Sequence, residues 1–238
     1  MKKIFLLFML FAVHPFIKGQ DLSGLEIPYK KFNFGAKIGF TSAIYLTTHF
    51  DIDGTRIVKA QNNYKVGYTG SLFMRYNFKA HYIQPEIAYT INRCEVYFEK
   101  PDFKQGTGKE FSTLRSELHS IDIPILYGYN FIKEDIYGMS FFIGPKIRYI
   151  LEGQSDMDYS NFDQKGITER FHRFNLGFTG GVAVYLSKIF FDFRYEQFLQ
   201  NISKKASYDK ELTPVEDQKN LRLHRRDHVL SFSLGFMF

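Results

Sequence analysis

The chain has 238 residues, of which 45% are hydrophobic and 24% are charged, and its formal net charge is +6. The mean hydropathy of −0.24 excludes a bundle of membrane-spanning helices, because each span would need about 20 consecutive apolar residues. Phenylalanine and tyrosine make up 18% of the chain, which excludes intrinsic disorder. The single cysteine, Cys94, excludes a disulfide framework and a multi-thiolate metal site, and we expect no redox role for it.

The N-terminus has the pattern of a secretory signal peptide. Residues 1–19 contain two lysines followed by an apolar run that is too short to span a bilayer. We expect this segment to be cleaved, which leaves residues 20–32 as a short periplasmic segment and residues 33–238 as the folded domain. Cleavage removes three lysines and no acid, so 28 basic residues remain against 25 acidic ones. This small excess, together with export, argues against a nucleic-acid partner.

Strict alternation of side-chain type predicts eight strands. In the last of them, Leu230, Phe232, Leu234, Phe236 and Phe238 share one face, and small residues share the other. The same split occurs in all eight segments, which are residues 33–45, 66–78, 81–93, 119–131, 140–152, 172–186, 189–198 and 229–238.

The two faces of these strands favour a membrane barrel. One face is apolar and nearly uncharged, as a lipid-facing surface must be, with Tyr and Phe near its rims. The other face is rich in Gly, Ser, Thr and Asn, which suits the crowded interior of a narrow barrel. A soluble up-and-down barrel with an apolar cavity would invert the faces and stays open as an alternative.

The connections between the strands alternate in length. Short ones are predicted near residues 79–80, 132–139 and 187–188, and long ones over residues 46–65, 94–118, 153–171 and 199–226. Short periplasmic turns and long external loops are typical of outer-membrane barrels. We therefore predict an all-β, eight-stranded antiparallel up-and-down transmembrane β-barrel with four long external loops and both termini in the periplasm. Ten strands remain possible if a loop forms a hairpin outside the membrane.

A C-terminal pattern and three internal segments carry resemblances to known outer-membrane barrels. The C-terminal pattern of Phe232, Leu234, Phe236 and Phe238 is similar to the signal that the barrel assembly machinery reads. The segments IDIPILYGYNF (residues 121–131), FFIGPKIRYIL (141–151) and VYLSKIFFDFRYEQFLQNI (184–202) resemble the PorT-like family of outer-membrane β-barrels. The resemblance implies a barrel over nearly the whole mature chain and, as one alternative, an accessory component of protein secretion.

Ten ionisable residues are predicted to face the barrel interior. By strand parity they are Lys37, Arg75, Glu86, Asp122, Lys146, Arg148, Arg173, Asp192, Arg194 and Glu196. Because eight strands leave room for little more than side chains, we expect these charges to pair and to fill the interior. A narrow conduit for a small solute is the alternative.

Catalytic and metal signals are weak. His119 and Ser120 are adjacent and so point to opposite faces of a strand, and no Ser–His pairing follows from the spacing of the other histidines. We expect no enzyme activity and no cofactor. The acidic pairs Asp51/Asp53 and Asp156/Asp158 lack the further ligands of a calcium loop, so we expect no metal site.

The last long loop is the most basic part of the chain. Its cluster LRLHRRDH brings Arg222, Arg225 and Arg226 close to the predicted outer rim, where guanidinium groups are able to bind lipid phosphates. Ordinary loop solvation is an equal alternative.

The sequence thus predicts a bacterial outer-membrane protein with a filled interior that serves as a surface scaffold, an adhesion protein or an accessory subunit. A narrow channel or a PorT-type secretion accessory is the alternative. The expected partners are outer-membrane lipid and lipopolysaccharide, the barrel assembly machinery during biogenesis, and secretion-system subunits.

Overall fold

The computed structural model describes residues 30–52, 55–56, 60–99, 111–134, 136–162, 165–214 and 221–238. The predicted signal peptide therefore lies outside the described residues. Apart from a single 3₁₀ turn, η1 (Glu152–Gln154), the elements formed by the described residues are all strands. None of the helical structure in these ranges is long and apolar enough to cross a membrane.

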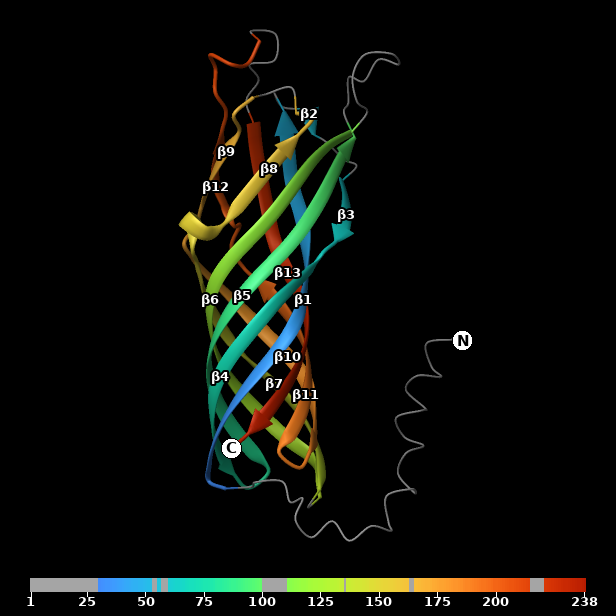
Figure 1. The fold of residues 1–238 in the computed structure, drawn as a ribbon, viewed down its shortest axis with the longest axis vertical. Helices are drawn as coiled ribbons and strands as arrows, with labels where there is room; N and C mark the ends of the chain where they lie inside the picture. Colours follow the sequence, from blue (N-terminus) through green and yellow to red (C-terminus); the bar gives the residue numbers. More distant parts are fainter. Residues whose placement is uncertain are drawn as a thin grey trace, which may run out of the picture.

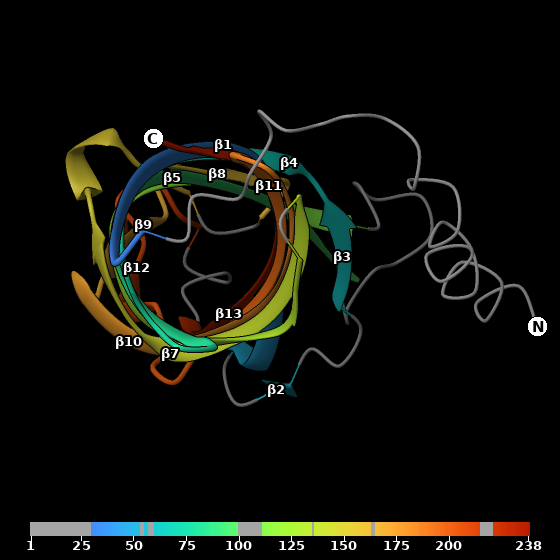
Figure 2. The ribbon, with the colours of Figure 1, turned by 90° about the horizontal axis from the view of Figure 1, so that it is seen from below.

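Eight antiparallel strands close into a ring (Figures 1 and 2). In ring order they are β1 (Phe32–Ile52), β4 (Val66–Phe78), β5 (His81–Glu99), β6 (Phe111–Lys133), β7 (Tyr137–Ile150), β10 (Phe174–Leu186), β11 (Ile189–Phe198) and β13 (Leu221–Met237). The ring closes where β1 pairs with β13, with Phe40 opposite Phe232. The predicted eight-stranded up-and-down barrel is confirmed, and closure leaves no wall strand with an unpaired edge.

Five short strands lie outside the ring. They are β2 (Thr55–Arg56), β3 (Ala60–Tyr64), β8 (Asp156–Ser160), β9 (Thr168–Phe171) and β12 (Ser203–Ser207). β2, β3 and β8 pair with β1, β5 and β6, and β9 pairs with β12. Figure 2 shows β2 and β3 beside the ring rather than within it. The extra strands therefore extend the wall beyond the barrel and do not widen it to ten strands.

The two ends of the barrel differ. At the turn end, β4 joins β5 through Lys79–Ala80, β10 joins β11 through Ser187–Lys188, and β6 joins β7 through residues 134–136. Lys79 and Ser187 have φ values of 56° and 55°, a conformation that suits tight hairpin turns. The C-terminus lies at this same end (Figure 1). The other end, the loop end, carries the long connections, so the predicted alternation of short and long connections is confirmed.

Several strands are longer than the sequence predicts. β5 continues to Glu99 and β6 already begins at Phe111, so much of the loop predicted over residues 94–118 is strand. Here the side-chain pattern reverses. Val96 and Leu114 face inward and are buried, whereas charged side chains face outward. Such a reversal is expected where the wall leaves lipid and its outer face meets water, and it hides the strands from a search for an apolar outer face.

The outward face of the wall is apolar between two aromatic belts. Near the turn end, ring contacts run from strand to strand from β1 to β7 through Phe32, Tyr76, Phe78, His81, Tyr129 and Phe141, with centroids 4.9–6.1 Å apart. Near the loop end, aromatic pairs recur as Phe40–Tyr68, Tyr89–His119, Tyr149–Phe174 and Tyr195–His228. Belts of this kind mark the two membrane interfaces of outer-membrane barrels.

Candidate functional site

The predicted interior charges are the first candidate site. Nine of the ten are buried inside the ring, namely Lys37, Arg75, Glu86, Asp122, Lys146, Arg148, Asp192, Arg194 and Glu196. They come from six wall strands. Each lies at an inward-facing position of its strand, because alternate side chains point into the barrel. Eight of them form two clusters at successive levels of the barrel, and Arg75 lies apart from both.

The first charge cluster joins Lys37, Glu86, Asp192 and Arg194. Arg194 binds Glu86 through two hydrogen bonds of 2.8 and 2.9 Å and binds Asp192 at 2.7 Å. Lys37 Nζ lies 2.8 Å from Asp192 Oδ2 and 3.2 Å from Glu86 Oε2. Each carboxylate therefore contacts both cations, which is the pairing that buried charges require.

The second charge cluster lies nearer the loop end and contains a residue that sequence reasoning missed. Lys146 Nζ lies 2.7 Å from both Asp122 and Glu196, and Arg148 binds Asp122 through two hydrogen bonds. Arg148 also donates to Asp227 Oδ2 at 3.0 Å. Asp227 is fully buried in β13, although the sequence placed it in the LRLHRRDH cluster, between the predicted loop of residues 199–226 and the predicted strand of residues 229–238. Parity with the predicted last strand was the signal that could have identified it.

Arg75 is held differently, by aromatic rings near the turn end. Its guanidinium lies 4.0 Å from the ring centroid of Tyr82 and 5.0 Å from that of Tyr185, and its Nε donates to Gln84. Cation–π contacts of this kind strengthen when they are desolvated. These rings belong to an apolar turn-end layer formed by Phe73, Tyr82, Leu126, Phe142, Ala183, Tyr185, Phe190 and Met237.

Some of these rings lie over glycines of the neighbouring strand. A Cβ atom on Gly128 would lie 2.0 Å from the Tyr82 ring, and one on Gly235 would lie 2.2 Å from the Phe190 ring. Glycine at these positions is therefore what admits large rings to so narrow a barrel. The sequence showed the glycines as a small-residue face, but it did not show that aromatic side chains fill the space above them.

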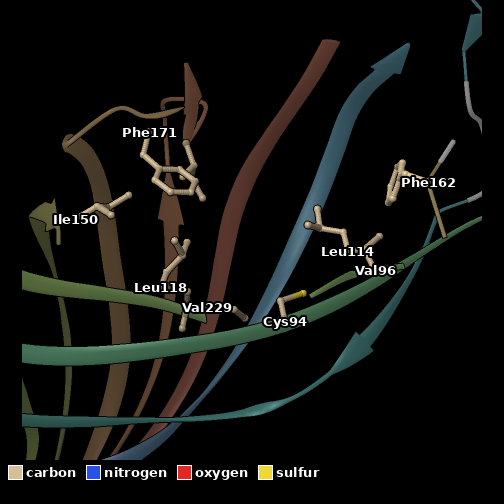
Figure 3. Close-up of a cluster of buried hydrophobic side chains, with 10 residues drawn as sticks. Cys94, Val96, Leu114, Leu118, Ile150, Phe162, Phe171 and Val229 are labelled. Atoms are coloured by element: carbon tan, nitrogen blue, oxygen red, sulfur yellow. The ribbon is translucent and has the colours of Figure 1, made fainter. Parts of the chain in front are cut away.

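A second apolar layer closes the loop end. Ala43, Cys94, Val96, Leu114, Leu118, Ile150 and Val229 from the wall pack with Phe162, Phe171 and Ile202 from the long connections. Figure 3 shows Phe162 and Phe171 turned toward the wall residues that surround them. Cys94 is one of the buried wall residues of this layer.

From the turn end to the loop end, the described interior residues follow the order apolar layer, first charge cluster, second charge cluster and apolar layer. The described interior residues include five buried cations (Lys37, Arg75, Lys146, Arg148 and Arg194) and five buried carboxylates (Glu86, Asp122, Asp192, Glu196 and Asp227), and all but Arg75 take part in ion pairs. This balanced, paired interior contrasts with the water-filled lumen of wide barrels.

Arg173 was predicted to face the barrel interior, and this prediction is wrong. Its side chain is 63% exposed and contacts Glu152 at 3.2 Å outside the ring. β10 begins only at Phe174, so the strand parity that placed Arg173 inside does not extend to it. Exposed pairs of this type contribute at most about 1 kcal/mol.

The wall extension at the loop end is the second candidate site. Here β3, β5, β6 and β8 form a sheet that extends past the aromatic belt near the loop end. Its outward face carries ion pairs. Arg115 donates to Glu95 at 2.6 Å, Lys65 lies 3.0 Å from Glu95, and Arg93 holds Glu117 at 2.7 Å. A polar hollow of about 340 Å³ lies among these side chains and is also lined by Asp156 and Asp158.

Acid should weaken this extension. The hydrogen bond from Arg115, with further hydrogen bonds from Lys65 and Asn63, lowers the pKa of Glu95 to about 2 from a usual value of about 4.3. A lowered pKa means that the charged form stabilises the fold above pH ~4.3 and that this contribution is lost as the pH falls toward 2. We expect protection factors of β3 and β5 amides in hydrogen exchange to fall between pH 4 and pH 2. In Glu95→Gln they should be lower at pH 7 and should lack this transition. An unchanged transition in the variant would assign it to another group.

The remaining predicted residues are placed as follows. Arg222, Arg225 and Arg226 lie in β13, opposite Asp51, Thr47 and Leu46 of β1, and not in a loop as predicted. β13 begins at Leu221, so the basic run is strand for the same reason that β5 and β6 are extended. Arg226 is exposed, and the side chains of Arg222 and Arg225 lie outside the described part of the structure. Lipid-phosphate binding by this cluster stays a prediction, as does the assembly role of Phe232, Leu234, Phe236 and Phe238, whose side chains face outward.

The candidate catalytic and metal residues are not brought together. His119 faces outward and its Nδ1 lies 2.7 Å from the Tyr89 hydroxyl, whereas Ser120 is buried inside the ring. Asp53 lies outside the described residues. Within the part of the chain that is described, no three His, Cys, Asp or Glu side chains are grouped as metal ligands would be.

Comparison with known proteins agrees with this geometry. The outer membrane protein beta-barrel domain model matches residues 19–204. Outer membrane protein OprG from Pseudomonas aeruginosa is similar in fold, with a TM-score of 0.53 and 13% identity over 88% of this chain and 97% of that one. Ail of Yersinia pestis (12% identity, 88% and 100% coverage) and Neisserial surface protein A (13%, 88% and 98%) each align with a TM-score of 0.36. None of the curated proteins compared matches the chain. Since the family model covers most of its length, this protein belongs to the outer membrane protein beta-barrel domain family.

Proposed function

We propose that the protein is a structural and interaction protein of the outer membrane that receives a partner at its loop end. In this proposal residues 1–19 direct export, the turn end and both termini face the periplasm, and the loop end faces outward. The protein performs no chemistry of its own. The observation that carries the proposal is a sheet of β3, β5, β6 and β8 that extends past the loop-end aromatic belt, above a barrel whose described interior is crossed by two apolar layers and two charge clusters.

The extended sheet offers a specific mode of binding. β3 and β8 form its two edges, and within the described chain each pairs with a single strand. An edge strand presents unpaired amide and carbonyl groups to which an extended segment of another protein adds as a further strand. β8 carries Asp156 and Asp158 on exposed positions, so a partner segment with basic side chains suits it.

Co-purification from native outer membranes in mild detergent tests this function. We expect the wild-type protein to recover a stoichiometric partner, and recovery of secretion-system subunits would identify the accessory role of the PorT type. The matched variants are Met157→Pro and Asp158→Pro. Adjacent amides of a strand point to opposite sides, so one of the two variants removes an amide from the open edge while it spares the pairing with β6.

The expected result is loss of the partner in the variant that keeps β8 paired with β6, as judged by hydrogen exchange. Lys210→Pro, at an exposed position in another connection, should keep the partner. A barrel that is recovered alone under all these conditions would contradict the interaction role and leave an autonomous surface protein.

A further inference from the structure

The outward face of the wall has a long apolar hollow. It lies over β1, β4 and β5, which run side by side in Figure 1, and reaches β11 and β13. Its volume is about 530 Å³, within the ~300–1,000 Å³ typical of small-molecule sites. Ile38, Phe40, Ile91, Phe191, Phe232 and Leu234 supply most of its walls. Because this hollow lies within an apolar surface, an apolar ligand such as a hydrocarbon chain would fit it.

Gly70 creates this hollow. It occupies an outward-facing position of β4 between Tyr68 and Leu72, and a Cβ atom built on it would meet no atom within 4 Å. A second hollow of about 480 Å³ shares Ile38, Gly70 and Tyr89 with the first and continues to Ile121. The two hollows therefore form one groove along the wall, which we call the Gly70 groove.

The loop end of the Gly70 groove is polar. Tyr68 and Tyr89 line it, and the guanidinium of Arg93 lies 5.6 Å from the centre of the Tyr68 ring. Arg93 is 39% exposed and uses two of its five N–H groups to hold Glu117, so the others remain able to donate. The Tyr89 hydroxyl contacts His119. An apolar groove thus ends beside a guanidinium at the outer membrane interface.

We propose that the Gly70 groove holds one acyl chain of lipid A, the phosphorylated lipid of the outer leaflet, with a lipid phosphate near Arg93. An apolar channel fits a hydrocarbon chain, and a planar guanidinium fits a phosphate. The choice of leaflet rests on the orientation proposed above. Arg93 also lines the polar hollow beside Asp156 and Asp158 of β8, whereas Gly70 does not. Variants of Gly70 therefore test the lipid site without altering the edge-strand surface, and either proposal can fail alone.

The barrel offers a matched pair of variants. Gly70→Leu fills the groove with a side chain that meets open space. Gly180→Leu adds the same side chain to the opposite wall, where Gly180 of β10 also faces outward but has Phe142 O at 3.6 Å and Ile143 Cγ1 at 3.8 Å from a Cβ atom. Both variants should retain the β-sheet circular dichroism and protease resistance of the wild type.

Native mass spectrometry of the detergent-purified full chain, titrated with lipid A or with phosphatidylethanolamine, measures occupancy. We expect one lipid A to bind to the wild type and to Gly180→Leu, with at least tenfold weaker binding to Gly70→Leu and weaker binding to Arg93→Gln. Equal lipid A binding by Gly70→Leu and the wild type would overturn the site. Equal binding of lipid A and phosphatidylethanolamine to the wild type would overturn the choice of lipid A. A wild-type dimer that is absent in Gly70→Leu would show that a second copy of the chain occupies the groove instead.

Discussion

Replacing Arg194 with methionine is expected to lower the free energy of unfolding by about 3–5 kcal/mol. Arg194 contacts both Glu86 and Asp192 inside the barrel, and all three side chains are at most 5% exposed. Without it, Lys37 alone must neutralise two buried carboxylates. Urea unfolding in lipid vesicles, followed by circular dichroism, measures the change.

Two controls separate this effect from a general loss of charge. Arg173→Met removes an exposed pair with Glu152 and should cost less than about 1 kcal/mol. Arg194→Met combined with Glu86→Gln leaves Lys37 opposite Asp192 alone and should recover part of the loss, because the remaining buried charges balance. A single Arg194→Met variant as stable as the wild type would mean that water reaches this cluster and screens it.

Replacing Phe178 with arginine should destabilise the folded barrel by about 2–4 kcal/mol, because Phe178 lies in the middle of β10 and faces lipid. The side chain is 51% exposed at the protein surface. In a soluble barrel the same change would place a charge in water and cost little. The same vesicle unfolding assay measures this variant.

The matched control for this change is Leu212→Arg. Leu212 is 65% exposed but lies in a connection at the loop end, where the new charge meets water, so the cost should be close to zero. If both variants were equally stable, the outward apolar face would not be in contact with lipid. The result would then favour the alternative of a soluble barrel.

Much of the fold follows from local chemistry. The alternation in segments such as residues 121–131 fixes which side chains enter the barrel, because adjacent side chains of a strand point in opposite directions. Parity alone therefore placed residues as far apart as Lys37 and Asp192 in one interior, where they are 2.8 Å apart. Which cation meets which carboxylate depends on strand stagger around the ring, and alternation contains no information about stagger.

Other features depend on what surrounds a strand. Arg173 departs from its predicted side because β10 begins after it, and Asp227 lies inside because β13 begins earlier than its apolar face suggests. Past the membrane the outward face carries Glu95 and Arg115, so the pattern that identifies a lipid-facing strand is reversed. The sequence did not predict the Gly70 groove, because a glycine on the outward face cannot be distinguished by alternation from the other small residues of the strands.

Conductance in a planar lipid bilayer tests the central claim most directly. Two apolar layers and two charge clusters cross the described interior, so the purified wild-type protein should insert without producing sustained single-channel currents. Large, stable currents from the correctly folded protein would contradict the filled interior and would favour the narrow-channel alternative.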